Sequence, residues 1–197
     1  MRILIVDDES LIRMDLRDIL ESEQHEVVGE ASNGVEAITM CKELKPDAVL
    51  MDVKMPELDG IEAARQIGFN HLAPVVLLTS YSQQDLVTKA RESGVYGYLI
   101  KPVREEQLIP TLEMACGRFL DDLESRQQMA DLEKTLEERK IIQKATGILM
   151  DLYKITEDES YNRIRQLSMK KRESIVSICK LIIQQASSSL KNYRSIH

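Results

Sequence analysis

An apolar run meets a carboxylate in the stretch Leu50-Met51-Asp52-Val53-Lys54-Met55-Pro56-Glu57-Leu58-Asp59-Gly60. The residues from Ala48 to Met51 are typical of a buried strand, and Pro56 and Gly60 then turn the chain before the next periodic segment. Asp52 is therefore expected at the carboxyl end of a strand, where ligands and chemistry gather in open α/β sheets. Taken alone, an Asp in this position is more simply explained as a cap for a strand-to-helix turn. A functional role is favoured only if other acidic and cationic residues lie at the same edge of the sheet.

The first 117 residues alternate short apolar runs with segments of helical period. The expected strands are residues 3–6, 27–30, 48–52, 75–78 and 98–100. The expected helices are residues 10–22, 34–44, 60–69 and 83–93, and a last one that begins after Pro102. This strict alternation predicts an α/β fold, a doubly wound, flavodoxin-like parallel sheet of five strands.

Polar residues follow four of these strands at the same edge of the predicted sheet. Asp7 and Asp8 follow the first strand, Asp52 the third, Thr79 the fourth and Lys101 the fifth. Three close carboxylates repel one another by about 4 kcal/mol per pair at an effective dielectric of about 20, unless a cation intervenes. Hard oxygen ligands at a partly hydrated site favour Mg²⁺. A phosphoryl group entering there would meet a carboxylate nucleophile, a metal, a lysine and a hydroxyl donor.

These residues resemble the receiver domains of two-component response regulators, and the resemblance spans the whole front half. The matching residues are Asp7-Asp8, Asp52, Met55-Pro56, Asp59-Gly60, Thr79, Tyr98 and Lys101-Pro102. The resemblance implies that Asp52 accepts a phosphoryl group from a sensor histidine kinase, and that Thr79 and Lys101 bind that group. Tyr98 would be the aromatic residue that turns inward when Thr79 moves.

The same resemblance implies a cofactor and a limit on catalysis. Mg²⁺ would be held by the side chains of Asp7, Asp8 and Asp52 and by the backbone carbonyl of Lys54. The protein would not be an enzyme with a separate substrate, and it would at most catalyse its own phosphorylation and dephosphorylation. An alternative is a pseudo-receiver in which phosphorylation is irrelevant and a partner protein holds the back end. The complete acidic site speaks against that alternative.

Residues 103–142 contain no cluster of loop-forming residues, and they predict one long helix of about 60 Å that continues the last receiver helix. Pro110 is expected to kink it. Its apolar positions step by threes and fours in two runs, with a skipped step between them: Leu112, Cys116, Phe119 and Leu123, then Met129, Leu132 and Leu136. Because charges of both signs flank this narrow seam, residues 118–138 are predicted to form a coiled-coil linker. The alternative is a single amphipathic helix that lies against its own domain.

Residues 139–197 predict a compact domain of three helices, at about 139–153, 156–169 and 173–189. Thr156 to Glu159 has the pattern of a capping box, and Ile148, Leu149 and Leu152 are expected to pack against the last two helices. Residues 1–117 carry 11 Lys and Arg against 21 Asp and Glu, or −10, whereas residues 139–197 carry 12 against 5, or +7. This asymmetry indicates a polyanionic partner for the back end, although a charge run is usually a solvated face.

Gly147 is unusual because glycine in a helix interior destabilises it by about 1 kcal/mol relative to alanine. Either another helix packs closely there, or a nucleic acid approaches the helix. Residues 139–183 resemble the ANTAR RNA-binding module of transcription antiterminators. The residues that carry the resemblance are Arg139, Ile142, Ala145, Gly147 to Met150, Tyr161, Leu167 to Met169 and Ile175. Thr146 departs from the pattern, since many members have lysine there.

The resemblance implies binding to paired RNA stem-loops in nascent transcripts, which prevents termination, and specific RNA readout favours exposed loop bases. The expected RNA-binding residues are Arg139, Lys144, Thr146, Gly147, Arg165, Lys170, Lys171 and Arg172. The whole chain, with residues 1–117 as receiver and 139–197 as ANTAR domain, looks most like the regulators of ethanolamine-utilisation operons. Phosphorylation is expected to produce a homodimer. The rival function is a DNA-binding response regulator, which requires a recognition helix for the major groove.

The composition excludes several other classes of protein. With 43% hydrophobic residues the chain can build a core, and disorder is not expected. No apolar run reaches the length of a membrane span, and Met1-Arg2 leads directly into an apolar strand, so a cytoplasmic protein without a membrane partner is expected. Cys41, Cys116 and Cys179 are odd in number and widely spaced, which predicts reduced core thiols.

Overall fold

The computed structural model describes residues 1–80 and 94–194, and of residues 187–194 it describes the backbone alone. The chain divides into two compact units, Met1–Ser125 and Arg126–His197. The predicted helix at residues 83–93 lies outside the described residues. Within the described part of the chain, no helix is long and apolar enough to cross a membrane.

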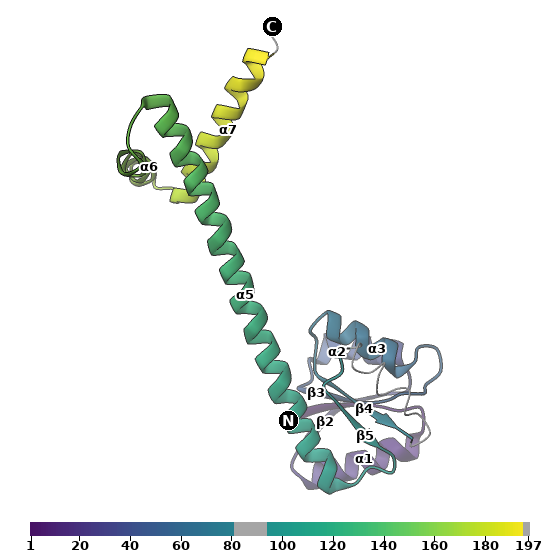
Figure 1. Cartoon of the computed structure of the whole chain (residues 1–197). Helices are drawn as coiled ribbons and strands as arrows, with labels where there is room; N and C mark the ends of the chain where they lie inside the picture. The colour runs from purple at the N-terminus through teal and green to yellow at the C-terminus, as the bar shows by residue number, and fades with distance from the viewer. Residues whose placement is uncertain (81–93, 195–197) are drawn as a thin grey trace. The chain divides into compact units, whose positions relative to one another are not determined.

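The first unit is built on a five-stranded sheet whose neighbouring strands are all parallel (Figure 1). The strands are β1 (Arg2–Val6), β2 (Glu26–Ala31), β3 (Ala48–Asp52), β4 (Val75–Thr79) and β5 (Gly97–Ile100). Their spatial order is β2-β1-β3-β4-β5, which confirms the predicted doubly wound sheet. The order reverses between β1 and β3, so the carboxyl ends of these two strands form the crevice where such folds bind ligands.

Helices cover both faces of the sheet, and each face has its own apolar core (Figure 1). The helices α2 (Gly34–Leu44) and α3 (Gly60–Phe69) pack on one face through residues such as Ala37, Cys41 and Ile67. The helix α1 (Ser10–Ser22) and the start of α5 pack on the other face. The side chains of Asn33 and Asp59 cap α2 and α3, which explains why the predicted starts of these helices are correct.

The helix α5 (Glu105–Tyr153) has 49 residues and belongs to both units. Its first turns are held on the sheet by Leu108, Leu112 and Ala115, which are completely buried. Pro110 does not end the helix, because it lies in the second turn and removes only one of the first intrahelical hydrogen bonds. The ring of Phe119 contacts that of Tyr96 edge to face, with their centroids 5.3 Å apart.

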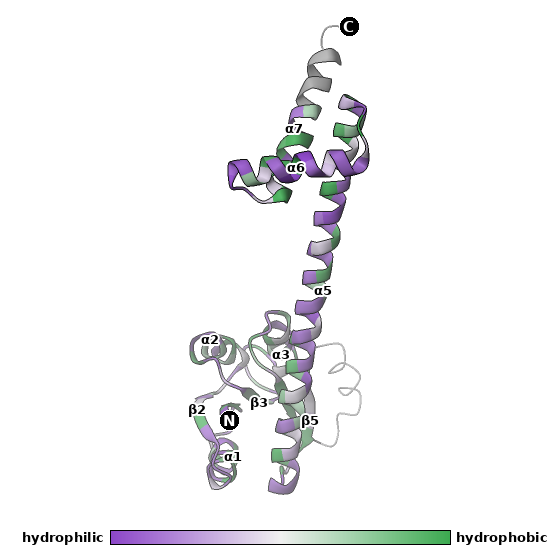
Figure 2. Cartoon of the chain, turned by 90° about the vertical axis from the view of Figure 1, so that its left-hand side faces the viewer, coloured by the Kyte–Doolittle hydropathy of each residue, from purple (hydrophilic) through white to green (hydrophobic). Residues whose placement is uncertain are grey.

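Further along α5, apolar residues are spaced between hydrophilic ones (Figure 2). Leu123 is half-buried, whereas Met129, Leu132 and Leu136 are exposed by 65%, 61% and 49%. Helical structure through residues 118–138 is thus as predicted, and Leu132 and Leu136 lie on the surface of the helix. Pairing of this seam with a second chain stays a prediction.

The second unit packs the end of α5 against α6 (Glu157–Lys171) and α7 (Ile175–Arg194). Its buried core consists of Ala145, Leu149, Ile164, Ile178 and Cys179. The capping box at the start of α6 is confirmed: Thr156 and Glu159 each accept a hydrogen bond from the other's backbone N–H. The expectation for Leu152 is wrong. Its side chain is 66% exposed, because the packed stripe of α5 runs through Ala145 and Leu149 instead.

The three cysteines are free thiols. Cys41 and Cys179 are buried in the cores of their units, and Cys116 is half-buried. Burial raises the pKa of the Cys41 thiol to about 12, so this thiol stays protonated at neutral pH. The thiols therefore act as core residues, as the sequence predicts.

Candidate functional site

Asp52 is the last residue of β3 and is 7% exposed. The chain leaves the strand through a tight return, in which the N–H of Gly60 donates to the carbonyl of Val53 over 2.9 Å. A Cβ atom on residue 60 would overlap the carbonyl oxygen of Asp52, so only glycine fits this close approach. The segment from Pro56 to Gly60 thus fixes the backbone conformation at Asp52.

A lysine joins two carboxylates at this edge of the sheet. The Nζ atom of Lys101, which follows β5, lies 2.7 Å from Oδ2 of Asp7 and 2.5 Å from Oδ1 of Asp52. The other Asp52 oxygen accepts a hydrogen bond of 2.7 Å from the backbone N–H of Lys54. Asp7 is completely buried, and its Oδ1 accepts from the N–H of Glu9. The structure therefore brings together three of the predicted site residues.

The surroundings of Asp52 make its ionisation less favourable than that of a carboxyl group in water. Burial raises the pKa of its carboxyl, and the opposing interactions with Lys101 do not cancel that effect. Burial also lowers the pKa of Lys101, but hydrogen bonds to Asp52 and Asp7 outweigh it and raise the pKa overall. Lys101 is thus held as an ammonium ion between two carboxylates, in a position to neutralise charge that arrives at Asp52.

The remaining predicted side chains are those of Asp8, which follows β1, Thr79, which ends β4, and Tyr98, which lies within β5. Asp8 is exposed, Tyr98 is 50% exposed, and the hydroxyl of Thr79 donates to the carbonyl of Ser80 over 3.3 Å. No three His, Cys, Asp or Glu side chains among the described residues form a ready metal-binding group. The expected donors are nevertheless all oxygen atoms, which suits Mg²⁺. A cation bound by Asp7 and Asp52 would share these carboxylates with Lys101.

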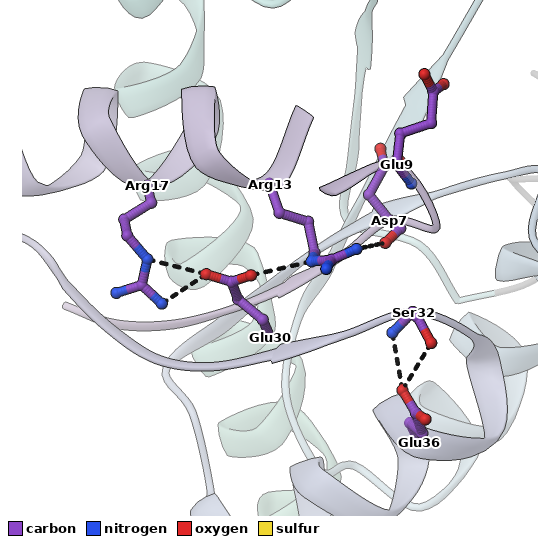
Figure 3. Close-up of polar contacts among 7 residues, drawn as sticks. All are labelled: Asp7, Glu9, Arg13, Arg17, Glu30, Ser32 and Glu36. Carbon is purple, nitrogen blue, oxygen red and sulfur yellow. Dashed lines mark hydrogen bonds and ion pairs between the residues drawn. The ribbon is translucent and has the colours of Figure 1, made fainter. Parts of the chain in front are cut away.

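The side chain of Arg13 contacts the backbone of Asp7 (Figure 3). The guanidinium of Arg13 donates to the carbonyl oxygen of Asp7 over 2.6 Å and to a carboxylate oxygen of Glu30 over 2.9 Å. The second oxygen of Glu30 accepts from Arg17 at 2.6 Å and 2.9 Å. Hydrogen bonds from Arg17, and then from Arg13, lower the pKa of Glu30 although burial opposes them. The network ties α1 and β2 to the loop that carries Asp7.

Sequence reasoning did not identify Arg13 and Glu30 as part of the site. The spacing of Arg13 and Arg17, four residues apart on one face of α1, is a visible signal. Their shared partner lies on β2, and only the strand order places β2 beside α1 and β1. The network of Arg13, Arg17 and Glu30 could therefore be identified only from the tertiary structure.

The predicted RNA-binding residues divide into exposed and buried ones. The exposed set is Arg139, Lys144, Arg165, Lys170, Lys171 and Arg172. Thr146 is 4% exposed, and its carbonyl accepts a hydrogen bond from the hydroxyl of Ser160, so its position does not favour the expected contact with a base. Gly147 is half-buried, and no described atom lies within 4 Å of a Cβ built on it, so close helix packing does not explain this glycine.

Comparisons with known proteins match both units. A model of the response regulator receiver domain matches residues 3–113, and a model of the ANTAR domain matches residues 130–183. The transcriptional regulatory protein PdtaR of Mycobacterium tuberculosis is 41% identical over 183 residues, which cover 93% of this chain and 89% of that protein. The likeness to ethanolamine-utilisation regulators stays a prediction.

Among solved structures, the chain is similar to the signal receiver domain of a modulated diguanylate cyclase from Desulfovibrio desulfuricans. The TM-score is 0.57 and the identity 33%, over 61% of this chain and 96% of that one. It is also similar to the receiver domain of sensor histidine kinase PA1611 from Pseudomonas aeruginosa, which holds a magnesium ion in its active-site cleft. There the TM-score is 0.53 and the identity 28%, over 59% and 97% of the two chains.

Proposed function

Because the chain belongs to the response regulators that join a receiver domain to an ANTAR domain, we propose that phosphorylation switches its binding to RNA. A sensor histidine kinase phosphorylates Asp52, and the modified protein binds paired stem-loops in nascent transcripts and prevents termination. The observation that supports this most directly is the Asp7–Lys101–Asp52 array, with its two buried carboxylates, in a chain that also carries an ANTAR domain. We assign residues 1–117 to the receiver, 118–138 to the linker and 139–197 to the ANTAR domain.

In this proposal, Asp52 acts as the nucleophile in phosphoryl transfer. A carboxylate oxygen attacks the phosphorus of a phosphohistidine, the phosphorus–nitrogen bond breaks, and its electron pair remains on the imidazole of the kinase. The product is an acyl phosphate on Asp52. The ammonium group of Lys101, 2.5 Å from the carboxylate, is positioned to bind an oxygen of the transferred group. The hydroxyl of Thr79 can donate to another oxygen after it leaves the Ser80 carbonyl.

Mg²⁺ fits the oxygen donors of this site, namely the side chains of Asp7, Asp8 and Asp52 and the backbone carbonyl of Lys54. When bound, this ion neutralises negative charge on the phosphoryl oxygens. Asp7 is fixed by the N–H of Glu9 and by Lys101, whereas Asp8 is exposed and free to turn toward an entering cation. In this proposal the buried carboxylate of Asp7 is a fixed ligand of the ion, and the exposed carboxylate of Asp8 turns toward the ion when it binds.

The switch is assigned to Thr79 and Tyr98. Tyr98 lies in β5 beside β4, the strand that ends in Thr79, and half of its side chain is exposed. When Thr79 moves toward the phosphoryl group, the space that it leaves allows the Tyr98 ring to turn inward. This movement changes the surface near the start of α5 and promotes pairing of two chains.

The phosphorylation step is tested with acetyl phosphate and Mg²⁺, followed by intact mass measurement. Wild-type protein should gain a single phosphoryl group, and Asp52→Asn should gain none. Asp59→Asn is the matched control, because Asp59 is an exposed carboxylate nearby and asparagine also caps a helix. If Asp52→Asn is phosphorylated at the wild-type rate, the acceptor assignment is wrong.

The RNA step is tested with a pool of RNA hairpins that have a fixed stem and a randomised loop. Selection on the phosphorylated full chain should enrich particular loop sequences, and tandem copies of an enriched hairpin should bind better than a single copy. A DNA duplex of the same stem sequence should compete poorly. Preferential binding of duplex DNA would instead support a DNA-binding regulator.

A further inference from the structure

A groove lies between α5 and α7 in the second unit and has a volume of about 350 Å³. It is lined by Glu137, Lys140, Ile141, Lys144, Lys180, Ile183 and Gln184. The lining positions 137, 140, 141 and 144 share one face of α5, and 180, 183 and 184 share one face of α7. Neither Lys180 nor the other α7 residues of this groove belong to the basic residues expected from the sequence to bind RNA.

The groove combines positive charge with an apolar surface. Its three lysines outnumber its one acid, Glu137, which lies 3.6 Å from Lys140. In the part of the chain that the structure describes, Lys144 and Lys180 form no ion pair. Ile141 and Ile183 supply the apolar surface between the lysines. Such a groove suits a ligand that carries both a flat apolar group and negative charge, as a nucleotide does.

Gly147 continues the same face of α5, three residues after Lys144 and seven after Lys140. Glycine destabilises a helix interior relative to alanine, so its presence needs a reason. No described atom of this chain would meet a Cβ atom at this position. The open space therefore suits a molecule whose atoms approach the helix backbone closely.

We propose that the α5–α7 groove holds an unpaired nucleotide of an RNA loop, with its sugar–phosphate backbone passing over Gly147. The base lies on Ile141 and Ile183, and Lys144 and Lys180 contact the phosphates. The groove is at the lower end of the range of about 300–1,000 Å³ for sites of small ligands, so it fits one nucleotide and not a duplex. This inference rests on the RNA binding proposed above and locates it on a surface that includes α7.

The first test is Gly147→Ala in the full chain, with a hairpin enriched from the randomised-loop pool as probe. Because space is open, the second unit should become more stable, which slower amide hydrogen exchange of α5 and α7 would report. Affinity for the hairpin should nevertheless fall by about tenfold, since the added methyl group occupies the path of the RNA backbone. Unchanged affinity, or a loss of stability, contradicts the inference.

The second test compares Lys180→Gln with Lys134→Gln, which removes the same charge from an exposed position of α5 outside the groove. Lys180→Gln should weaken binding and reduce the slope of log affinity against log salt by about one unit. Lys134→Gln should leave the slope unchanged. Equal effects of the two substitutions would mean that charge acts at long range and that the groove is not a contact site.

A photoreactive uridine in the loop provides a direct readout. Crosslinks should map to residues 137–147 and 180–184, and crosslinks confined to α6 would overturn the proposal. Competition by free mononucleotides as effective as the hairpin would show a small-nucleotide site instead. A dimer lost in Gly147→Ala without RNA would show that a second chain covers the groove. If wild-type protein enriches no hairpin at all, the proposed function itself fails.

Discussion

Asp52 shows how the chemistry of one residue conflicts with the stability of the fold. Its carboxyl is buried, which raises its pKa despite the nearby Lys101 ammonium. A carboxyl group whose pKa is higher in the folded state than in the unfolded state destabilises the fold when it is ionised. The destabilisation is fully present above the folded-state pKa and disappears as the pH falls below it. The role proposed for Asp52 would therefore come at the expense of stability, as often happens in functional sites.

We predict that Asp52→Asn stabilises the first unit at neutral pH by about 0.5–2 kcal/mol while it abolishes phosphorylation. Lys101 keeps its contact with Asp7 in this variant, so the ammonium is not left without a partner. Amide hydrogen exchange of the central strands measures the effect in this unit alone. The difference from wild type should shrink as the pH is lowered toward the pKa of Asp52. A less stable variant at neutral pH would contradict this account.

Arg13 is predicted to position Asp7 for metal binding, because it holds the Asp7 carbonyl and is itself held by Glu30. Arg13→Ala should raise the Mg²⁺ concentration for half-maximal phosphorylation by about tenfold, as loss of support behind metal ligands often does. Arg13→Lys should restore part of the affinity. Arg65→Ala is the control, since Arg65 pairs with Glu62 on the surface of α3. An unchanged Mg²⁺ requirement would assign Arg13 a purely structural role.

At the scale of elements, the sequence predicts most of this structure because local signals agree with the sheet. The strand at residues 48–52 and the helices at 10–22, 34–44 and 60–69 have their predicted bounds. Asn33 and Asp59 start two of these helices, and those residues are recognisable caps. The error at Leu152 has a different cause. Stripes through Ala145 and Leu149 or through Ile148 and Leu152 have the same helical spacing, and only the packing of α6 and α7 selects one.

The capping box of α6 gives a prediction for one element. Thr156→Ala removes the acceptor for the N–H of Glu159 and should destabilise the start of α6 by about 1 kcal/mol. The amides of α6 should then exchange with solvent about fivefold faster. Thr135→Ala makes the same chemical change at an exposed position inside α5, where alanine is the better helix former. Exchange in α6 should not change in that control.

At the scale of the whole molecule, the helix α5 joins the receiver unit, which carries Asp52, to the ANTAR unit. The helix is continuous from Glu105 to Tyr153, and its exposed seam includes Met129, Leu132 and Leu136. Large apolar residues at such spacing are typical of a coiled coil that lacks its partner. Moving a population from mostly monomer to mostly dimer needs roughly 3–5 kcal/mol of differential stabilisation, which changes at the phosphorylated receiver face must supply.

Dimerisation would matter for the proposed function because it joins two ANTAR units. Two tethered units that face two linked hairpins gain an effective concentration that can raise avidity by about 10² or more. The sequence identifies the seam but not its partner, because a narrow apolar stripe fits equally well against the same domain. In the structure, Leu132 and Leu136 are exposed. Substitutions at these two residues therefore test the pairing of two chains without disturbing a core.

We predict that replacing Leu132 and Leu136 by aspartate abolishes the phosphorylated dimer and the advantage of paired hairpins, while Asp52 is still phosphorylated. Four buried charges in the dimer seam would each lose hydration, so pairing becomes unfavourable. Gln128→Asp with Thr135→Asp is the control, because it adds the same charge at exposed positions of α5 that belong to neither run of seam residues. Light scattering with acetyl phosphate and Mg²⁺ measures the dimer, and titration with single and tandem hairpins measures the avidity. A seam variant that binds tandem hairpins as tightly as wild type would show that the two ANTAR units are joined elsewhere.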